Sequence, residues 1–140
     1  MLQLPQERCV VWPHNPIRIG DFSLLQPDVA LLRPEQSLYC HRWPDAADVL
    51  LAVEIADASL DHDRRRKVPL FARHRVPEVW LVSLPEGRLE VHRDPHGMRY
   101  RDVSLLAEGG RVAPLCAPDV AVDVGDALRV QFLEGGGKAI

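Results

Sequence analysis

The sequence feature that most constrains the fold is the apolar run Val49-Leu50-Leu51-Ala52-Val53, which an acid, Glu54, follows directly. A run this dense predicts a strand that is buried on both faces. Because side chains alternate along a strand, Leu50, Ala52, Glu54 and Ala56 are expected to share one face. A carboxylate on a buried face loses hydration worth several kcal/mol unless a cation or hydrogen-bond donors replace the water. The neighbouring elements should therefore supply a partner for Glu54.

A helix is predicted directly after this strand, and it could bring a cation back over Glu54. Ser59 is placed to be its N-cap, and the helix should end at about Arg73. Pro69 lies inside it and is expected to kink it, because proline removes a hydrogen bond. The helix carries Lys67, one of only two lysines in the chain.

The remaining segments complete a mixed sheet in a single domain, residues 1–140, of the α/β or α+β class. In the segment Leu89–Arg93, apolar and polar residues alternate, which predicts an antiparallel strand with one wet face. Other strands are expected at 9–12, 17–19, 29–32, 79–83, 98–106 and 120–124, a turn at Gly20-Asp21, a short helix at 126–133 and a flexible tail at 134–140.

Charge and cysteine content narrow the classes of function. The formal net charge of −3 gives no overall basic surface, so nucleic-acid binding would depend on a local patch. The three cysteines are odd in number and far apart, which indicates reduced thiols in a cytosol. The sequence shows no signal peptide and no membrane span, so a cytoplasmic protein is expected.

Three residues are candidates to converge on one site: Asp28 at the head of a strand, Glu54, and Lys67 on the helix. Mg²⁺ takes oxygen ligands, often one or two carboxylates together with water and substrate phosphate. Lys67 would then polarise an attacking water or offset charge on the phosphate, and Asp63, four residues earlier, could hold its ammonium. This set predicts metal-assisted hydrolysis of a phosphodiester.

Four segments in consistent order resemble motifs of the Uma2 family, a group of restriction-endonuclease-like proteins within the PD-(D/E)XK nuclease superfamily. The segments are Gln26-Pro27-Asp28-Val29, Val53-Glu54-Ile55, Asp63-Arg64-Arg65-Arg66-Lys67 and Val76-Pro77-Glu78-Val79-Trp80-Leu81-Val82. The resemblance covers roughly residues 17–124. It implies a mixed central sheet flanked by helices and Mg²⁺- or Mn²⁺-dependent cleavage of DNA.

The resemblance also assigns roles to individual residues. It implies that Asp28, Glu54 and the backbone carbonyl of Ile55 bind the metal, with Gln26 and Asp63 in supporting positions. In the superfamily pattern a lysine stands two residues after the glutamate, where this chain has Ala56. The resemblance implies that this lysine has moved to the helix, as Lys67.

The beginning of the chain departs from the family. Members usually open with a helix and a hairpin, which are expected to be missing before the Asp28 strand. A truncated gene, a degenerate copy and completion by a second subunit are all compatible with this departure. An unpaired sheet edge favours a homodimer.

Two classes of function stay open. The first is a metal-dependent endonuclease, in which Arg64, Arg65 and Arg66 contact DNA phosphates. The second is an inactive remnant that acts as an oligomerisation or interaction module. In that case Glu54 and Lys67 form a structural ion pair and the arginines only form a solvated helix face. The sequence does not specify the DNA that would be cut or the pathway.

Overall fold

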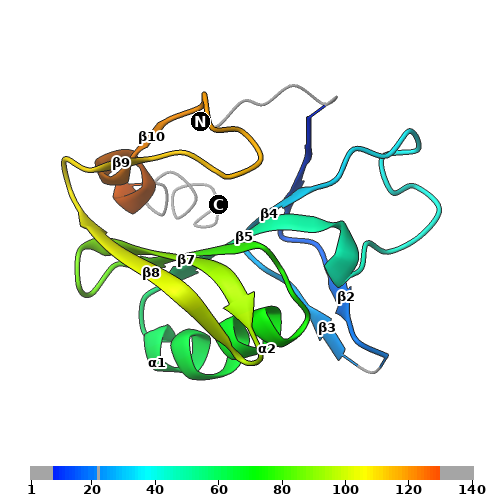
Figure 1. The fold of residues 1–140 in the computed structure, drawn as a ribbon, viewed down its shortest axis with the longest axis horizontal. Coiled ribbons are helices and arrows are strands. Elements are labelled where there is room, and N and C mark those ends of the chain that lie inside the picture. Colours follow the sequence, from blue (N-terminus) through cyan, green and yellow to red (C-terminus); the bar gives the residue numbers. More distant parts are fainter. Residues whose placement is uncertain (1–7, 22, 130–140) are drawn as a thin grey trace, which may run out of the picture.

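The centre of the computed structural model, which describes residues 8–21 and 23–129, is a six-stranded sheet (Figure 1). Its strands lie in the order β1-β4-β5-β6-β7-β8. β5 and β6 run parallel, and all other neighbouring pairs are antiparallel, so the sheet is mixed, as the sequence predicts. The strands span Val10–Pro13 (β1), Val29–Leu32 (β4), Val49–Ala56 (β5), Glu78–Ser83 (β6), Arg88–His96 (β7) and Arg99–Ala107 (β8).

A helical crossover joins the parallel strands β5 and β6 and lies under one face of the sheet (Figure 1). It consists of α1 (Leu60–His62), the π-helical turn η2 (Asp63–Lys67) and α2 (Val68–Arg73). Within η2 the N–H of Val68 donates to the carbonyl of Asp63, five residues earlier. Pro69 follows directly, and its ring would clash with the carbonyl four residues before it in a regular α-helix. The kink predicted at Pro69 therefore takes the form of a widened turn.

A small hairpin, β2 (Ile17–Ile19) with β3 (Ser23–Leu25), precedes β4. The predicted turn at Gly20 is confirmed, with a backbone φ of +71°. A Cβ at this glycine would lie 3.2 Å from Cε1 of His74, so both the conformation and the space favour glycine. Among the described residues, the elements that precede β4 are thus the strands β1, β2 and β3 and the turns between them.

The C-terminal part of the chain covers the opposite face of the sheet. β9 (Arg111–Val112) pairs with β10 (Val122–Asp123), and residues 124–129 are helical. Residues 130–133 of the predicted helix and the predicted tail 134–140 lie outside the described residues. Within the described part of the chain, no helix combines the length and the apolar character that crossing a membrane requires.

Two apolar clusters pack on the two faces of the sheet. The cluster on the crossover side includes Ala52, Phe71 and Val79, and the cluster on the other side includes Leu51 and Trp80. Alternation along β5 thus turns Glu54 toward the crossover helices, where only 1% of its surface is exposed. The element that follows the strand is therefore the one that meets the buried acid.

Two expectations about strand faces are wrong. Leu50 does not share the face of Ala52, because the register between β4 and β5 shifts at Leu31/Leu32 and moves Leu50 to the opposite cluster. The face of β7 expected to be wet is buried as well, with Glu90 4% and His92 8% exposed. An ion pair from the crossover covers these two residues, as described below.

An η1 turn (Ala46–Asp48) precedes β5 and begins with a capping box. The Asp45 side chain accepts the N–H of Ala47, and the Asp48 side chain accepts the N–H of Asp45. The chain thus enters the central strand in a fixed direction.

Candidate active site

Asp28 and Glu54 interlock at the point where β4 begins beside β5. The N–H of Asp28 donates to Oε1 of Glu54 at 3.2 Å, and the N–H of Ile55 donates to Oδ2 of Asp28 at 2.7 Å. These reciprocal bonds hold both carboxylates in defined positions next to each other. Glu54 is buried, whereas 28% of the Asp28 side chain is exposed. The pair therefore joins an interior acid to one that solvent can reach.

Lys67 lies between two buried acids. Its Nζ is 2.8 Å from Oε2 of Glu54 and 3.3 Å from Oδ1 of Asp63, which is 2% exposed as a residue. The Lys67 side chain itself is 27% exposed. The structure thus brings together Glu54, Lys67 and Asp63, and it links this group to Asp28 through the backbone contacts of β4 and β5.

Ser59 plays a different part from the predicted one. It occupies the N-cap position of α1, but its side chain makes no capping hydrogen bond. Its hydroxyl donates instead to Oδ2 of Asp63 at 3.1 Å. A buried carboxylate needs donors, and Asp63 lies one turn further along the helix. Ser59, Asp63, Lys67 and Glu54 therefore form one continuous polar chain.

Burial and ion pairing determine the protonation of the acid and the lysine in this group of polar residues. Burial raises the pKa of Glu54 to about 7, although the hydrogen bond and charge of Lys67 act in the opposite direction. Burial also lowers the pKa of Lys67, but contacts with Glu54 and Asp63 outweigh it and leave that pKa above its ordinary value. Lys67 is therefore a cation near neutral pH, while the charge of Glu54 depends on what else the site contains.

The candidate metal ligands offer carboxylate oxygens, the type of donor that a hard divalent cation prefers. Oε2 of Glu54 and Oδ1 of Asp63 are buried, and the ammonium of Lys67 is the partner of both, at 2.8 and 3.3 Å, so a bound ion would share Glu54 with Lys67. Among the described residues, no group of three His, Cys, Asp or Glu side chains is placed to hold a metal ion. Asp28 and Glu54 supply two carboxylates, and Mg²⁺ often takes one or two together with water and substrate phosphate.

The remaining predicted site residues lie as follows. The N–H of Ile55 points to Asp28, and in antiparallel pairing a residue's N–H and C=O face the same neighbour, so its carbonyl faces that side too. Gln26 is exposed just before Asp28, and Arg65 and Arg66 are exposed on η2.

Arg64 differs from the two arginines that follow it. Its guanidinium pairs with Glu86 and with the buried Glu90 of β7. The second oxygen of Glu90 lies 3.0 Å from Nε2 of His92. Arg64 is thus bound to the sheet rather than presented to solvent. This network has no local sequence signal, because Arg64 and Glu90 are 26 residues apart.

His14 also lies next to the site. Its Nδ1 is 3.8 Å from Oδ1 of Asp28, and its N–H donates to the Asp28 carbonyl at 3.1 Å. The sequence gives no histidine a role, and only the pairing of β1 with β4 brings His14 here. His14 is therefore a neighbour of the candidate site that only the structure identifies.

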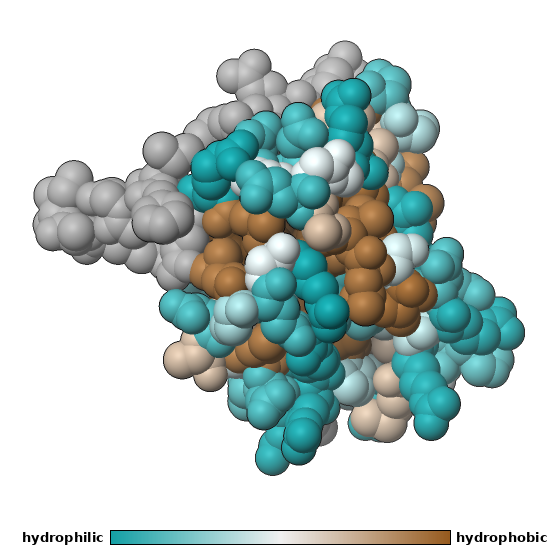
Figure 2. Space-filling view, turned by 90° about the vertical axis from the view of Figure 1, so that its left-hand side faces the viewer, coloured by the Kyte–Doolittle hydropathy of each residue, from teal (hydrophilic) through white to brown (hydrophobic). Residues whose placement is uncertain are grey.

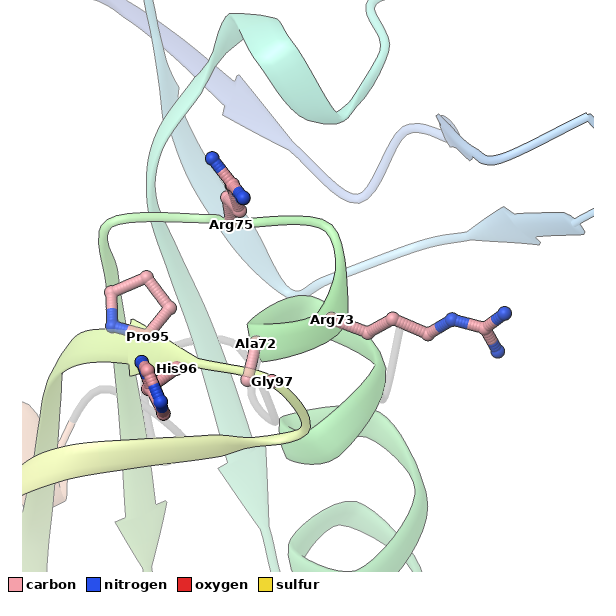
Figure 3. A pocket seen from close by; sticks show the side chains of 6 residues that line it. All are labelled: Ala72, Arg73, Arg75, Pro95, His96 and Gly97. Atoms are coloured by element: carbon pink, nitrogen blue, oxygen red, sulfur yellow. The ribbon is translucent and has the colours of Figure 1, made fainter.

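A surface pocket lies elsewhere, between the end of α2 and the turn that joins β7 to β8. It has a volume of about 470 Å³, and it is lined by Ala72, Arg73, Arg75, Pro95, His96 and Gly97 (Figure 3). The side chain of Arg73 extends away from Pro95 and His96. The lining contains no acid, so this pocket lacks the donors that the Asp28–Glu54 site offers.

Comparisons with known proteins identify the family and the fold. Residues 2–125 match the model of the Uma2 family, described as "Putative restriction endonuclease". The fold is similar to the crystal structure of a "putative nuclease belonging to DUF820" from Anabaena variabilis ATCC 29413, with a TM-score of 0.70 and 16% identity. The similarity covers 89% of this chain and 70% of that one. No curated protein matches the sequence.

Proposed function

Because the chain belongs to the Uma2 family, we propose that it is a metal-dependent endonuclease that hydrolyses phosphodiester bonds in DNA. The observation that carries the proposal is the meeting of Asp28, Glu54 and Lys67 at one point of the sheet. One or two carboxylates are what a Mg²⁺ site of this kind takes from the protein, and a nearby cation can offset charge on a phosphate. The similarity of the fold to that of a "putative nuclease" is compatible with the proposal.

The carboxylates of Asp28 and Glu54 and the carbonyl of Ile55 would hold one Mg²⁺ or Mn²⁺ ion. Such an ion activates a bound water and offsets negative charge on a phosphate. Asp28 is the half-exposed member, so a phosphate could approach from its side. Glu54 fixes the inner side of the site through its bond to the Asp28 backbone.

Lys67 acts on the reacting phosphate. Its ammonium can donate hydrogen bonds to an attacking water or a phosphate oxygen, and it offsets the charge that develops there. Asp63 keeps this ammonium charged and oriented, and Ser59 in turn orients Asp63. The exposed Arg65 and Arg66 on the same turn would contact the DNA backbone. A second copy of the chain is the proposed protein partner.

A second function is favoured by one observation. The distance of 2.8 Å between Lys67 and Glu54 also suits a purely structural ion pair. A remnant that retains the fold as an interaction module would show the same contact. The two functions differ in what Lys67 must do, and its substitution separates them.

The test is cleavage of plasmid DNA, with Mg²⁺ or with a chelator, by wild type, Lys67→Ala and Lys67→Arg. The nuclease predicts Mg²⁺-dependent cleavage that Lys67→Ala abolishes. It also predicts that Lys67→Arg is severely impaired, because the planar guanidinium does not replace a compact ammonium.

Thermal melting of the same proteins is the control. Lys67→Ala leaves two buried acids without their cation, so its free energy of unfolding should be roughly 3 kcal/mol lower than that of wild type. This is the lower end of the loss for a broken buried pair, because Glu54 can take up a proton. Wild type without cleavage, together with near-normal melting of Lys67→Arg, would favour the remnant.

A further inference from the structure

The outer edge of β8 is the longest unpaired strand edge in the described part of the chain. β8 has nine residues, and β7 is its only partner among the described strands. β1, the other edge strand, has four residues and ends in Pro13, which cannot donate to a ladder. A long edge left open invites pairing with another chain. β8 is therefore the edge of this sheet that a partner can extend.

Apolar side chains accompany this edge. Val103 is 48% exposed and Leu105 is 53% exposed, and both stand on the crossover face beside Glu90 and His92. Figure 2 shows the side of the molecule that is at the left in Figure 1, where β8 lies, and apolar residues gather in the middle of this surface. A partner strand at the β8 edge would cover Val103 and Leu105.

We infer that the occupant of this edge is β8 of a second copy, paired antiparallel about a two-fold axis at Ser104. A second copy of the chain is the partner in the proposed function, and this inference, which rests on that proposal, assigns the surface through which the two copies pair. In this register Val103 lies opposite Leu105 of the other copy, and the reverse contact repeats it. Both exposed apolar residues thus meet an apolar residue.

Neighbouring registers are worse. An axis at Asp102 places this acid opposite Asp102 of the other copy, which sets two like charges against each other. An axis at Val103 places Leu105 opposite Arg101 of the other copy. An axis at Leu105 sets Asp102 against Glu108, again two like charges. Only the axis at Ser104 pairs the apolar residues without placing like charges opposite each other.

The placement of charges is compatible with the same register. With the axis at Ser104, Arg101 lies opposite Ala107 and Asp102 lies opposite Leu106 of the other copy, so no charged residue of β8 faces a like charge. Antiparallel pairing adds on average about one backbone hydrogen bond per residue pair.

The experiment is disulfide trapping with Ser104→Cys in a Cys40→Ser background, which removes the exposed native thiol. At the axis, the introduced cysteines of two copies lie within the Cα separation of a disulfide, roughly 4.4–6.8 Å. Mild oxidation by a small disulfide should therefore join two chains, with two thiols oxidised and the reagent reduced. Asp102→Cys is the control, because residue 102 lies opposite residue 106.

A second pair of variants tests the surface without cysteine. Leu105→Lys places a charge against Val103 of the partner and should weaken the dimer by more than about tenfold. Leu115→Lys is the matched control, since Leu115 is equally exposed, at 52%, and lies outside β8. Light scattering of wild type should give twice the chain mass of 15.7 kDa.

The outcomes separate the proposals. A monomer at high concentration overturns the dimer altogether. A dimer that Leu105→Lys leaves intact overturns this surface. A disulfide that forms between copies of Val103→Cys or Asp102→Cys, but not between copies of Ser104→Cys, overturns this register. DNA cleavage is read independently, so a trapped dimer without cleavage contradicts only the nuclease.

Discussion

At the scale of single residues, the cost of burying the Glu54 carboxylate determines the contacts and the pKa values of the candidate site. Its carboxylate is 1% exposed, and its nearest cation is the single ammonium of Lys67, which Asp63 also contacts. One cation between two buried acids compensates each of them only in part. This is why the pKa of Glu54 is raised to about 7 despite the ion pair.

This shift predicts a pH dependence of stability in the metal-free protein. Between the ordinary Glu54 pKa of 4.5 and the folded value of about 7, the folded state retains a proton that the unfolded state has released. Raising the pH through this window therefore favours unfolding. The contribution of Glu54 to the free energy of unfolding should fall by roughly 2–3 kcal/mol from pH 5 to pH 8.

Urea unfolding of wild type and Glu54→Gln at several pH values measures this contribution as the difference between the two proteins. The raised pKa of Lys67 contributes stability that is constant below its ordinary pKa of 10.5 and is lost only above that value, so it does not change within this window. A difference that does not change with pH would show that Glu54 titrates normally.

The residues that could be predicted are those that short-range rules position. Asp28 and Glu54 are found because each stands at a defined place on a strand, and Lys67 because helix spacing sets it beside Asp63. Glu90 and His92 could not be predicted to be buried, because their cover, Arg64, comes from a different element. Sequence periodicity shows which face a residue takes, but not what lies on that face.

At the scale of elements, the π-helical turn η2 sorts its basic residues into separate roles. Arg64 faces the sheet and pairs with Glu86 and Glu90, and Lys67 faces Glu54. Arg65 and Arg66 remain exposed. The sequence shows three equivalent arginines, whereas the structure makes one of them an anchor for the turn that carries Lys67.

Alanine substitutions should separate these roles. Arg64→Ala leaves the buried Glu90 with one donor fewer and should lower the free energy of unfolding by about 2 kcal/mol. Arg65→Ala and Arg66→Ala should leave melting unchanged, weaken DNA binding and each reduce its salt dependence by about one unit of slope.

Melting curves and binding titrations at several salt concentrations measure both effects. Equal melting losses for all three variants would show that η2 packs as one face. Unchanged binding in Arg65→Ala and Arg66→Ala would remove these residues from the DNA interface.

At the scale of the whole molecule, strand alternation and the helical crossover make the mixed sheet predictable from the sequence. The bulge that moves Leu50 and the packing of residues 111–129 over the sheet were not predictable, because long-range contacts decide both. The sheet places Asp28 and Glu54 beside each other, and among the described strands the outer edge of β8 has no partner. The site and the proposed dimer edge are thus separate features of one sheet.

The most direct measurement is a calorimetric titration with Mn²⁺ of wild type, Asp28→Asn and Glu54→Gln, in buffers of different ionisation enthalpy. A metal site at Asp28 and Glu54 should bind one ion per chain and release a proton near pH 6.5, because a bound cation favours the ionised form of Glu54. Both variants should lose this binding, and Asp123→Asn, on the exposed β10, should retain it. Wild type that binds no Mn²⁺, or Glu54→Gln that binds it as tightly as wild type, would contradict a metal site at Asp28 and Glu54.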